Sequence, residues 1–85
     1  MKTYTFPWHC EAASGELQLD ISPKEIELIK AAYRDAFDRL EDSDSLVKIR
    51  RRALKQLPFY ERGAKQDIRI YFPEEIKKEV DKEDE

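Results

Sequence analysis

The alternation of apolar and polar positions predicts two β-strands at the start of the chain. The apolar members of the two runs are Tyr4, Phe6 and Trp8, then Leu17, Leu19 and Ile21. Aromatic and branched side chains at every second position are typical of strands with one buried face. Between the runs, Ser14-Gly15 provides a turn signal, so we expect a β-hairpin. Pro7 has no amide hydrogen to donate to a ladder, which favours an edge position for the first strand.

A helix start follows the hairpin directly. Ser22-Pro23-Lys24-Glu25 has the form of a capping box, with Ser22 as the N-cap and Glu25 reaching back to it. Ile21 and Ile26 have the spacing of a hydrophobic staple. Apolar residues then recur every three or four positions and predict a helix to about Leu40 or Glu41. These residues are Ile26, Ile29, Tyr33, Ala36, Phe37 and Leu40.

A second helix is predicted after a break at residues 41–45, whose serines and aspartates are N-cap candidates. Pro58 ends this helix. Its predicted apolar face consists of Leu46, Val47, Ala53, Leu54 and Leu57. The short connection between the two helices predicts an antiparallel helical hairpin.

The last part of the chain predicts one more strand and a short helix. The strand pattern is an alternation of Ile68, Ile70 and Phe72 with Arg69 and Tyr71. Residues 73–76 open a short helix whose acidic residues suit its positive end. From Lys77 onward Val80 is the only apolar residue, so we expect a charged tail that frays in water.

Together these elements predict a small α+β domain of β-β-α-α-β topology over residues 1–76, with a charged tail over residues 77–85. We expect a three-stranded antiparallel sheet with the helical hairpin on one face and the other face open. The edge position of the first strand gives the order 1-2-3, with strand three antiparallel to strand two. Order 2-1-3 is the alternative if Pro7 sits in a bulge.

Composition supports one folded domain, because 40% of the 85 residues are hydrophobic and 11% are aromatic. The net charge is −3, from 16 basic and 19 acidic residues, which is not the basic balance of a nucleic-acid-binding chain. Cys10 is the only cysteine, so no internal disulfide can form. No apolar segment resembles a signal peptide or spans a bilayer. We therefore expect a cytoplasmic protein without membrane contact.

The sequence contains little that suggests catalysis. His9 and Cys10 are adjacent, and neighbours in a strand point to opposite faces, which works against a paired nucleophile and base. One His and one Cys are too few for a zinc site. The acidic residues from Asp38 to Asp44 lack the glycine and the spacing of a calcium loop. We expect no metal, cofactor or catalytic residue, and an enzyme using His9 and Cys10 ranks last among the hypotheses.

The second helix carries the clearest candidate surface. Its cations Lys48, Arg51, Arg52 and Lys55 share one helix face at spacings of i, i+3, i+4 and i+7. Such a stripe can meet phosphates or an acidic protein partner. No aromatic residue interleaves these cations to stack on bases, which favours the protein partner.

Three further residues are hard to explain by folding alone. Arg50 falls within the apolar stripe, where it can snorkel, form a buried bridge to Asp20 or Glu16, or anchor a partner. Leu28 lies on the polar side of the first helix, and Tyr71 lies on the outer face of the third strand. We therefore predict a non-enzymatic protein interaction module whose partner is another protein or, through the open sheet face or edge, a second copy of the chain. Weak nucleic-acid binding through the cationic stripe is the alternative.

Overall fold

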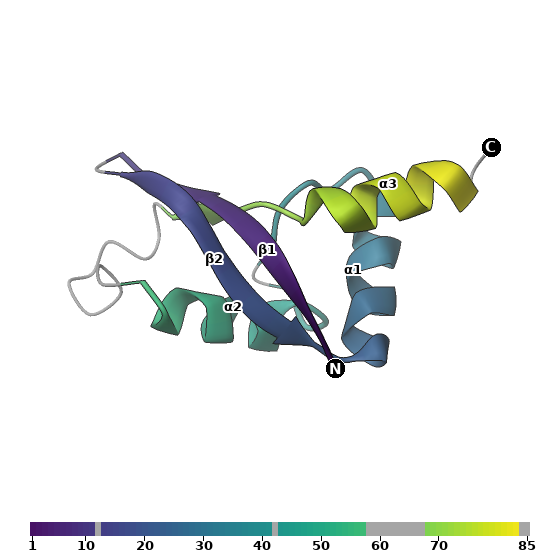
Figure 1. The fold of residues 1–85 in the computed structure, drawn as a ribbon, viewed down its shortest axis with the longest axis horizontal. Coiled ribbons are helices and arrows are strands. Elements are labelled where there is room, and N and C mark those ends of the chain that lie inside the picture. The colour runs from purple at the N-terminus through teal and green to yellow at the C-terminus, as the bar shows by residue number, and fades with distance from the viewer. Residues whose placement is uncertain (12, 42, 58–67, 84–85) are drawn as a thin grey trace.

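The computed structural model describes residues 1–11, 13–41, 43–57 and 68–83. Its elements, in chain order, are β1 (Lys2–His9), β2 (Ser14–Ile21), α1 (Pro23–Arg34), α2 (Val47–Lys55), β3 (Arg69–Ile70) and α3 (Glu74–Glu83) (Figure 1). The strands form one antiparallel sheet of order β2-β1-β3. The prediction of a small α+β domain is confirmed.

The β1–β2 hairpin has the predicted alternation, and its turn lies earlier than expected. The register is continuous from Lys2 opposite Ile21 to His9 opposite Ser14. The turn is closed by the Cys10 amide, which donates to the Ala13 carbonyl at 2.8 Å. Ser14-Gly15 therefore opens β2 instead of forming the turn.

Gly15 has a packing role in β2. It lies opposite Trp8, and a Cβ atom at Gly15 would lie 3.2 Å from the indole ring. The missing side chain therefore leaves room for the tryptophan.

The observed strand order is the predicted alternative, 2-1-3, and the leading order 1-2-3 is wrong, because β1 is the central strand. β3 pairs with β1 through Trp8 opposite Ile70, so β3 runs in the same direction as β2 and not against it. Pro7 is compatible with the central position of β1, and the β1–β2 ladder passes through it without a bulge. Its carbonyl accepts a hydrogen bond from the Tyr71 amide at 2.8 Å, so its missing donor lies on the β3 side, where the strand pairing is short.

The capping box at the start of α1 is confirmed. The Glu25 amide donates to Ser22 Oγ at 3.3 Å, and the Ser22 amide donates to Glu25 Oε1 at 3.1 Å. Pro23 occupies the first helical position, where its missing amide hydrogen costs nothing.

The predicted end of α1 near Leu40 is wrong, since the helix ends at Arg34. Ala36 has φ 72°, in the left-handed region. Its amide donates to the Tyr33 carbonyl at 3.0 Å, and the Phe37 amide donates to the Ala32 carbonyl at 3.1 Å. These two bonds form a Schellman motif, which usually has glycine at the position of Ala36.

Beyond this stop, residues 38–40 run alongside β3 as an extra extended segment. The bonds are from the Leu40 amide to the Ile70 carbonyl at 2.8 Å and from the Phe72 amide to the Asp38 carbonyl at 3.0 Å. Leu40 is thereby buried against the sheet, whereas Phe37, predicted to be in the core, is 46% exposed.

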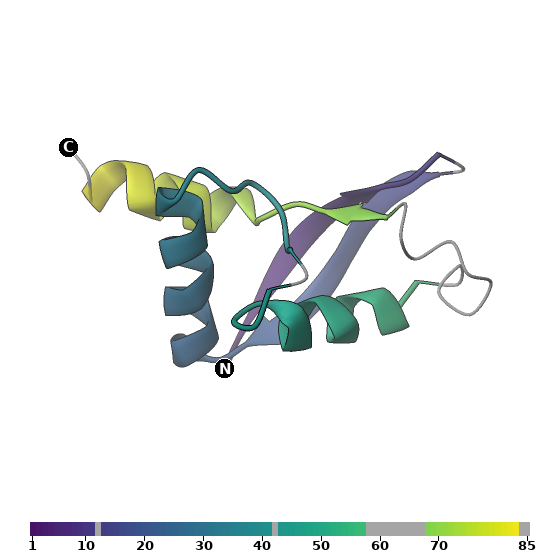
Figure 2. The same cartoon turned by 180° about the vertical axis from the view of Figure 1, so that it is seen from behind.

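The helices do not form the predicted antiparallel hairpin. α1 packs against α3, and α2 packs against β2. Figures 1 and 2 show α2 alongside the β1–β2 hairpin and α1 past the hairpin end where the N-terminus lies, with the far end of α1 next to α3. α2 starts after Leu46 without a side-chain cap, so the predicted serine and aspartate caps are not used. The predicted stop at Pro58 lies outside the described residues.

The predicted fraying from Lys77 is also wrong, because α3 continues to Glu83. Ile76 and Val80, one helical turn apart, are both buried. Two apolar residues on one face are enough to dock the helix here, because α1 supplies charged partners for its acidic residues.

Candidate functional site

The predicted cationic stripe lies on α2, and its four members differ in their surroundings. Lys48, Arg51 and Lys55 are exposed, and none of them forms an ion pair with a residue that the structure describes. Arg52 is half-buried and turned toward α1, where Nη2 lies 2.7 Å from Glu25 Oε2. We call Lys48, Arg51 and Lys55 the cationic face of α2.

The Arg52–Glu25 pair ties α2 to the start of α1. Burial raises the pKa of the Glu25 carboxyl, but the Ser22 amide and the Arg52 guanidinium outweigh this effect and hold the pKa below its ordinary value. Glu25 thus closes the capping box and links two helices, so Arg52 has a structural role.

A shallow hollow of about 660 Å³ adjoins the cationic face, between α2 and the hairpin. Gln56 Nε2 donates to the Gln18 carbonyl at 2.9 Å and fixes the end of α2 to the outer edge of β2. Met1, another residue that lines the hollow, is 87% exposed. The lining residues are Met1, Thr3, Gln18, Leu19, Asp20, Arg52, Lys55 and Gln56. The hollow therefore offers both charged groups and exposed apolar surface.

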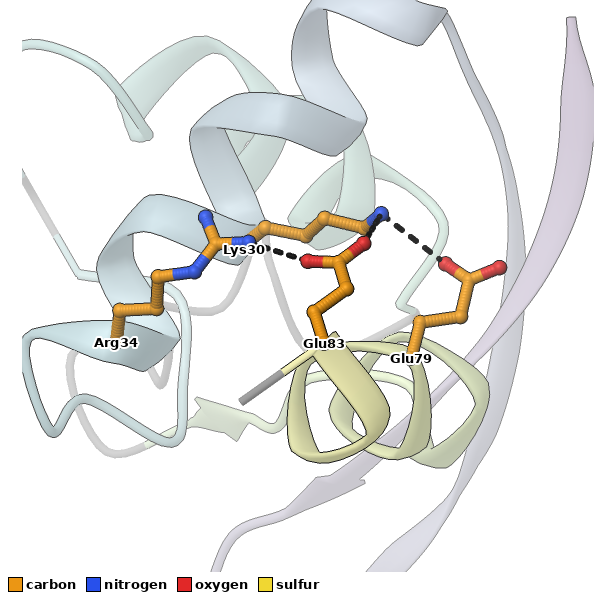
Figure 3. A network of polar contacts seen from close by, with 4 residues as sticks. All are labelled: Lys30, Arg34, Glu79 and Glu83. Atoms are coloured by element: carbon orange, nitrogen blue, oxygen red, sulfur yellow. Dashed lines mark hydrogen bonds and ion pairs between the residues drawn. The ribbon is translucent and has the colours of Figure 1, made fainter. Parts of the chain in front are cut away.

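An ion-pair network between α1 and α3 was not predicted from the sequence. Lys30 Nζ lies 3.2 Å from Glu83 Oε1 and 3.5 Å from Glu79 Oε2, and Arg34 also pairs with Glu83 (Figure 3). The Lys30 side chain is only 11% exposed. The sequence signal was the matching i, i+4 spacing of the two cations and of the two glutamates, on helices far apart in the chain.

The network shifts the pKa values of Lys30 and Glu83 in opposite directions. The hydrogen bond to Glu83 raises the pKa of Lys30 despite its burial. The Lys30 hydrogen bond, with that of Arg34, lowers the pKa of Glu83. Lys30 and Glu83 are therefore both charged near neutral pH.

The remaining predicted surface residues are scattered. Leu28 is half-buried and packs against the core, so folding accounts for it. Arg50 is half-buried and already has an interaction partner, so it is not part of the cationic face. Tyr71 is half-buried on the open sheet face, opposite Arg39 of the extra extended segment. Leu28 lies on α1, Tyr71 lies next to β3, and Arg50 lies on α2 but is only half-exposed, unlike Lys48, Arg51 and Lys55.

The candidate catalytic pair is also separated by burial, since His9 is exposed and Cys10 is buried. Across the described ranges, no three His, Cys, Asp or Glu side chains gather in a way that would hold a metal ion. No helix within those ranges is long and apolar enough to cross a membrane.

The fold and this surface define a small α+β domain with one exposed cationic helix. No protein-family model, curated protein or solved structure matches the chain.

Proposed function

We propose that this chain is a non-enzymatic binding module whose α2 cationic face holds an acidic segment of another protein. The observation that carries the proposal is the row of Lys48, Arg51 and Lys55. These three exposed cations cover about 10 Å of helix on a chain with a net charge of −3, without ion-pair partners among the described residues.

The charge pattern of α2 supports a binding role over simple solvation. Residues 46–57 contain no acidic residue, whereas exposed helices usually mix charges of both signs. Like charges four residues apart, such as Arg51 and Lys55, destabilise a helix by about 0.2–0.5 kcal/mol per pair. Among the described residues, the cations within ion-pair distance of a carboxylate are Lys30, Arg34, Arg39, Arg52 and Lys77. Lys24, Lys78 and Lys82 are exposed without such a pair in the described part of the chain, but they lie on helices that also carry acidic residues. An acidic partner would relieve the repulsion on α2.

A protein segment fits this surface better than a nucleic acid. α2 has no aromatic residue on which a base can stack. The exposed Met1 beside the hollow offers an apolar contact, which a protein side chain can use and a phosphate backbone cannot. The chemistry of the surface therefore favours an acidic peptide that also carries an apolar side chain.

The test measures binding of a fluorescent glutamate-rich peptide by anisotropy at low and at moderate salt. We expect binding to the native chain and its loss when Lys48, Arg51 and Lys55 are all replaced by Glu. Binding should weaken with added salt, because exposed charges are screened.

The control carries the same change in net charge on other surfaces, with Lys24, Lys78 and Lys82 replaced by Glu. These lysines are exposed and lie on α1 and α3. We expect the control to keep most of the binding. Equal loss of peptide binding in both variants would show that net charge alone matters and would refute the proposal. Tighter binding of single-stranded DNA than of the peptide would also refute it.

A further inference from the structure

The fold already contains one contact between a cationic and an acidic helix. Lys30 and Arg34, four residues apart on α1, hold Glu79 and Glu83, four residues apart on α3 (Figure 3). Residues at this spacing lie on one helix face, so a row of cations meets a row of carboxylates along two neighbouring helices.

α2 presents the same type of row to solvent. Arg51 and Lys55 are four residues apart, and Lys48 precedes Arg51 by one turn. From this match we infer that the acidic segment bound by α2 is itself an α-helix, with glutamates four residues apart on one face. This inference rests on the proposed function, because it specifies the partner of the same surface.

The contact between α1 and α3 also indicates that the partner helix carries apolar residues beside its acidic row. On α3, buried Ile76 and Val80 each lie three residues before one of the paired glutamates, so an apolar row borders the acidic row. Beside α2, the hollow at Lys55 with its exposed Met1 is placed to receive such an apolar side chain. The partner helix therefore carries an apolar residue three positions before a glutamate of its acidic row.

A second copy of this chain is not the occupant that the geometry favours. Glu79 and Glu83 are already bound to α1 within the fold, and releasing them would also expose Ile76 and Val80. The partner is therefore a separate protein with a free acidic helix.

The experiment compares three peptides of equal charge, each titrated into the full chain. The first is an alanine-rich helix with glutamates at i, i+4 and i+8 beside one leucine row. The second has the same composition with the glutamates spread around the helix. The third is an extended, threonine-rich peptide with glutamates at alternate positions. Their spacing of about 6.7 Å is close to the rise of about 6.0 Å between helical residues four positions apart. Circular dichroism verifies the conformation of each peptide.

We expect the first peptide to bind roughly tenfold more tightly than the other two, since two or three aligned ion pairs each contribute a modest share. Replacing Arg51 and Lys55 by Glu should remove this preference, and a peptide with lysines in place of the glutamates should then bind the variant. The matched control replaces Lys78 and Lys82, also four residues apart, and should keep the preference.

These outcomes test separately whether α2 binds acidic segments and whether the bound segment is a helix. Equal binding of the ordered and scrambled helices, or tighter binding of the extended peptide, would overturn the helical partner and leave the acid-binding function standing. Binding of the first peptide that is unchanged when Lys48, Arg51 and Lys55 are reversed would overturn both.

Discussion

The left-handed residue that ends α1 allows a quantitative test of the fold. Ala36 has φ 72° at the C-terminal cap, a conformation that costs an L-residue about 1–2 kcal/mol. Glycine is free of this penalty but loses about 0.4–1 kcal/mol more chain entropy on folding. The Ala36 side chain is exposed, so its removal should sacrifice little packing. We therefore expect Ala36→Gly to stabilise the protein by about 0.5–1 kcal/mol.

Urea and thermal unfolding measure this effect. For a domain of this size 1 kcal/mol shifts Tm by about 4–8 °C, so an increase of about 2–8 °C is expected. The slope of the urea transition should not change, because the surface exposed on unfolding is the same. Ala31→Gly is the matched control, since Ala31 is exposed inside α1. It should destabilise the protein by about 1 kcal/mol.

The pair of variants distinguishes two courses of the chain after Arg34. If α1 continued to Leu40, as the apolar spacing predicts, both glycines would lie inside a helix and both would destabilise. Opposite signs are the expected result. A loss of stability in Ala36→Gly similar to that in Ala31→Gly would refute the Schellman stop and the placement of residues 38–40 beside β3.

Two further stability predictions follow from the helix contacts. Glu25→Gln should cost about 1 kcal/mol at pH 7, because it weakens the capping box and the pair with Arg52. The pKa of Glu25 lies below its ordinary value of 4.5, so its stabilisation is present above pH 4.5 and is lost as the pH falls through the lowered pKa. Urea midpoints against pH should show a smaller acid loss in Glu25→Gln, and parallel curves would contradict the link. Val80→Ala should cost about 1–3 kcal/mol and Lys82→Ala almost nothing, whereas equal small effects would indicate a frayed C-terminal helix.

The start of α1 could be predicted because its signal is local. Ser22 and Glu25 are three residues apart, and their hydrogen bonds depend on no distant part of the chain. The end of the helix was mispredicted because Leu40 continues the helical spacing of apolar residues. Leu40 is apolar for a different reason, because it is buried beside β3. A periodic pattern cannot distinguish these two reasons for a buried leucine.

The strand order and the last helix depended on contacts between distant segments. Pro7 excludes a donor on only one side of β1, so it is compatible with a central strand whose other side pairs fully. α3 was mispredicted because Ile76 and Val80 are few for a docked helix. The cations that hold it, Lys30 and Arg34, lie about fifty residues earlier in the chain. Such pairing has no local signature.

The candidate surface could be predicted only in part, because helical spacing is a local property whereas ion pairing between helices is not. The shared face of the α2 cations follows from helical spacing, and three of the four are exposed as a row. Arg52 left this row because Glu25, in another helix, lies next to it. Self-association through the open sheet face stays a prediction, and both outer edges of the sheet are partly covered, by Gln56 on β2 and by residues 38–40 on β3.

The basic residues that join helices can be compared with those of the cationic face of α2. Lys30, Arg34 and Arg52 join helices, and each has a carboxylate from another element within ion-pair distance. The cationic face of α2 has the same spacing and no such carboxylate among the described residues. The buried side of α2 already attaches it to the core through Ile49, Ala53 and Leu54. The outward charges are not needed for that attachment, and their concentration on a single helix is the feature that the proposed acidic partner helix would account for.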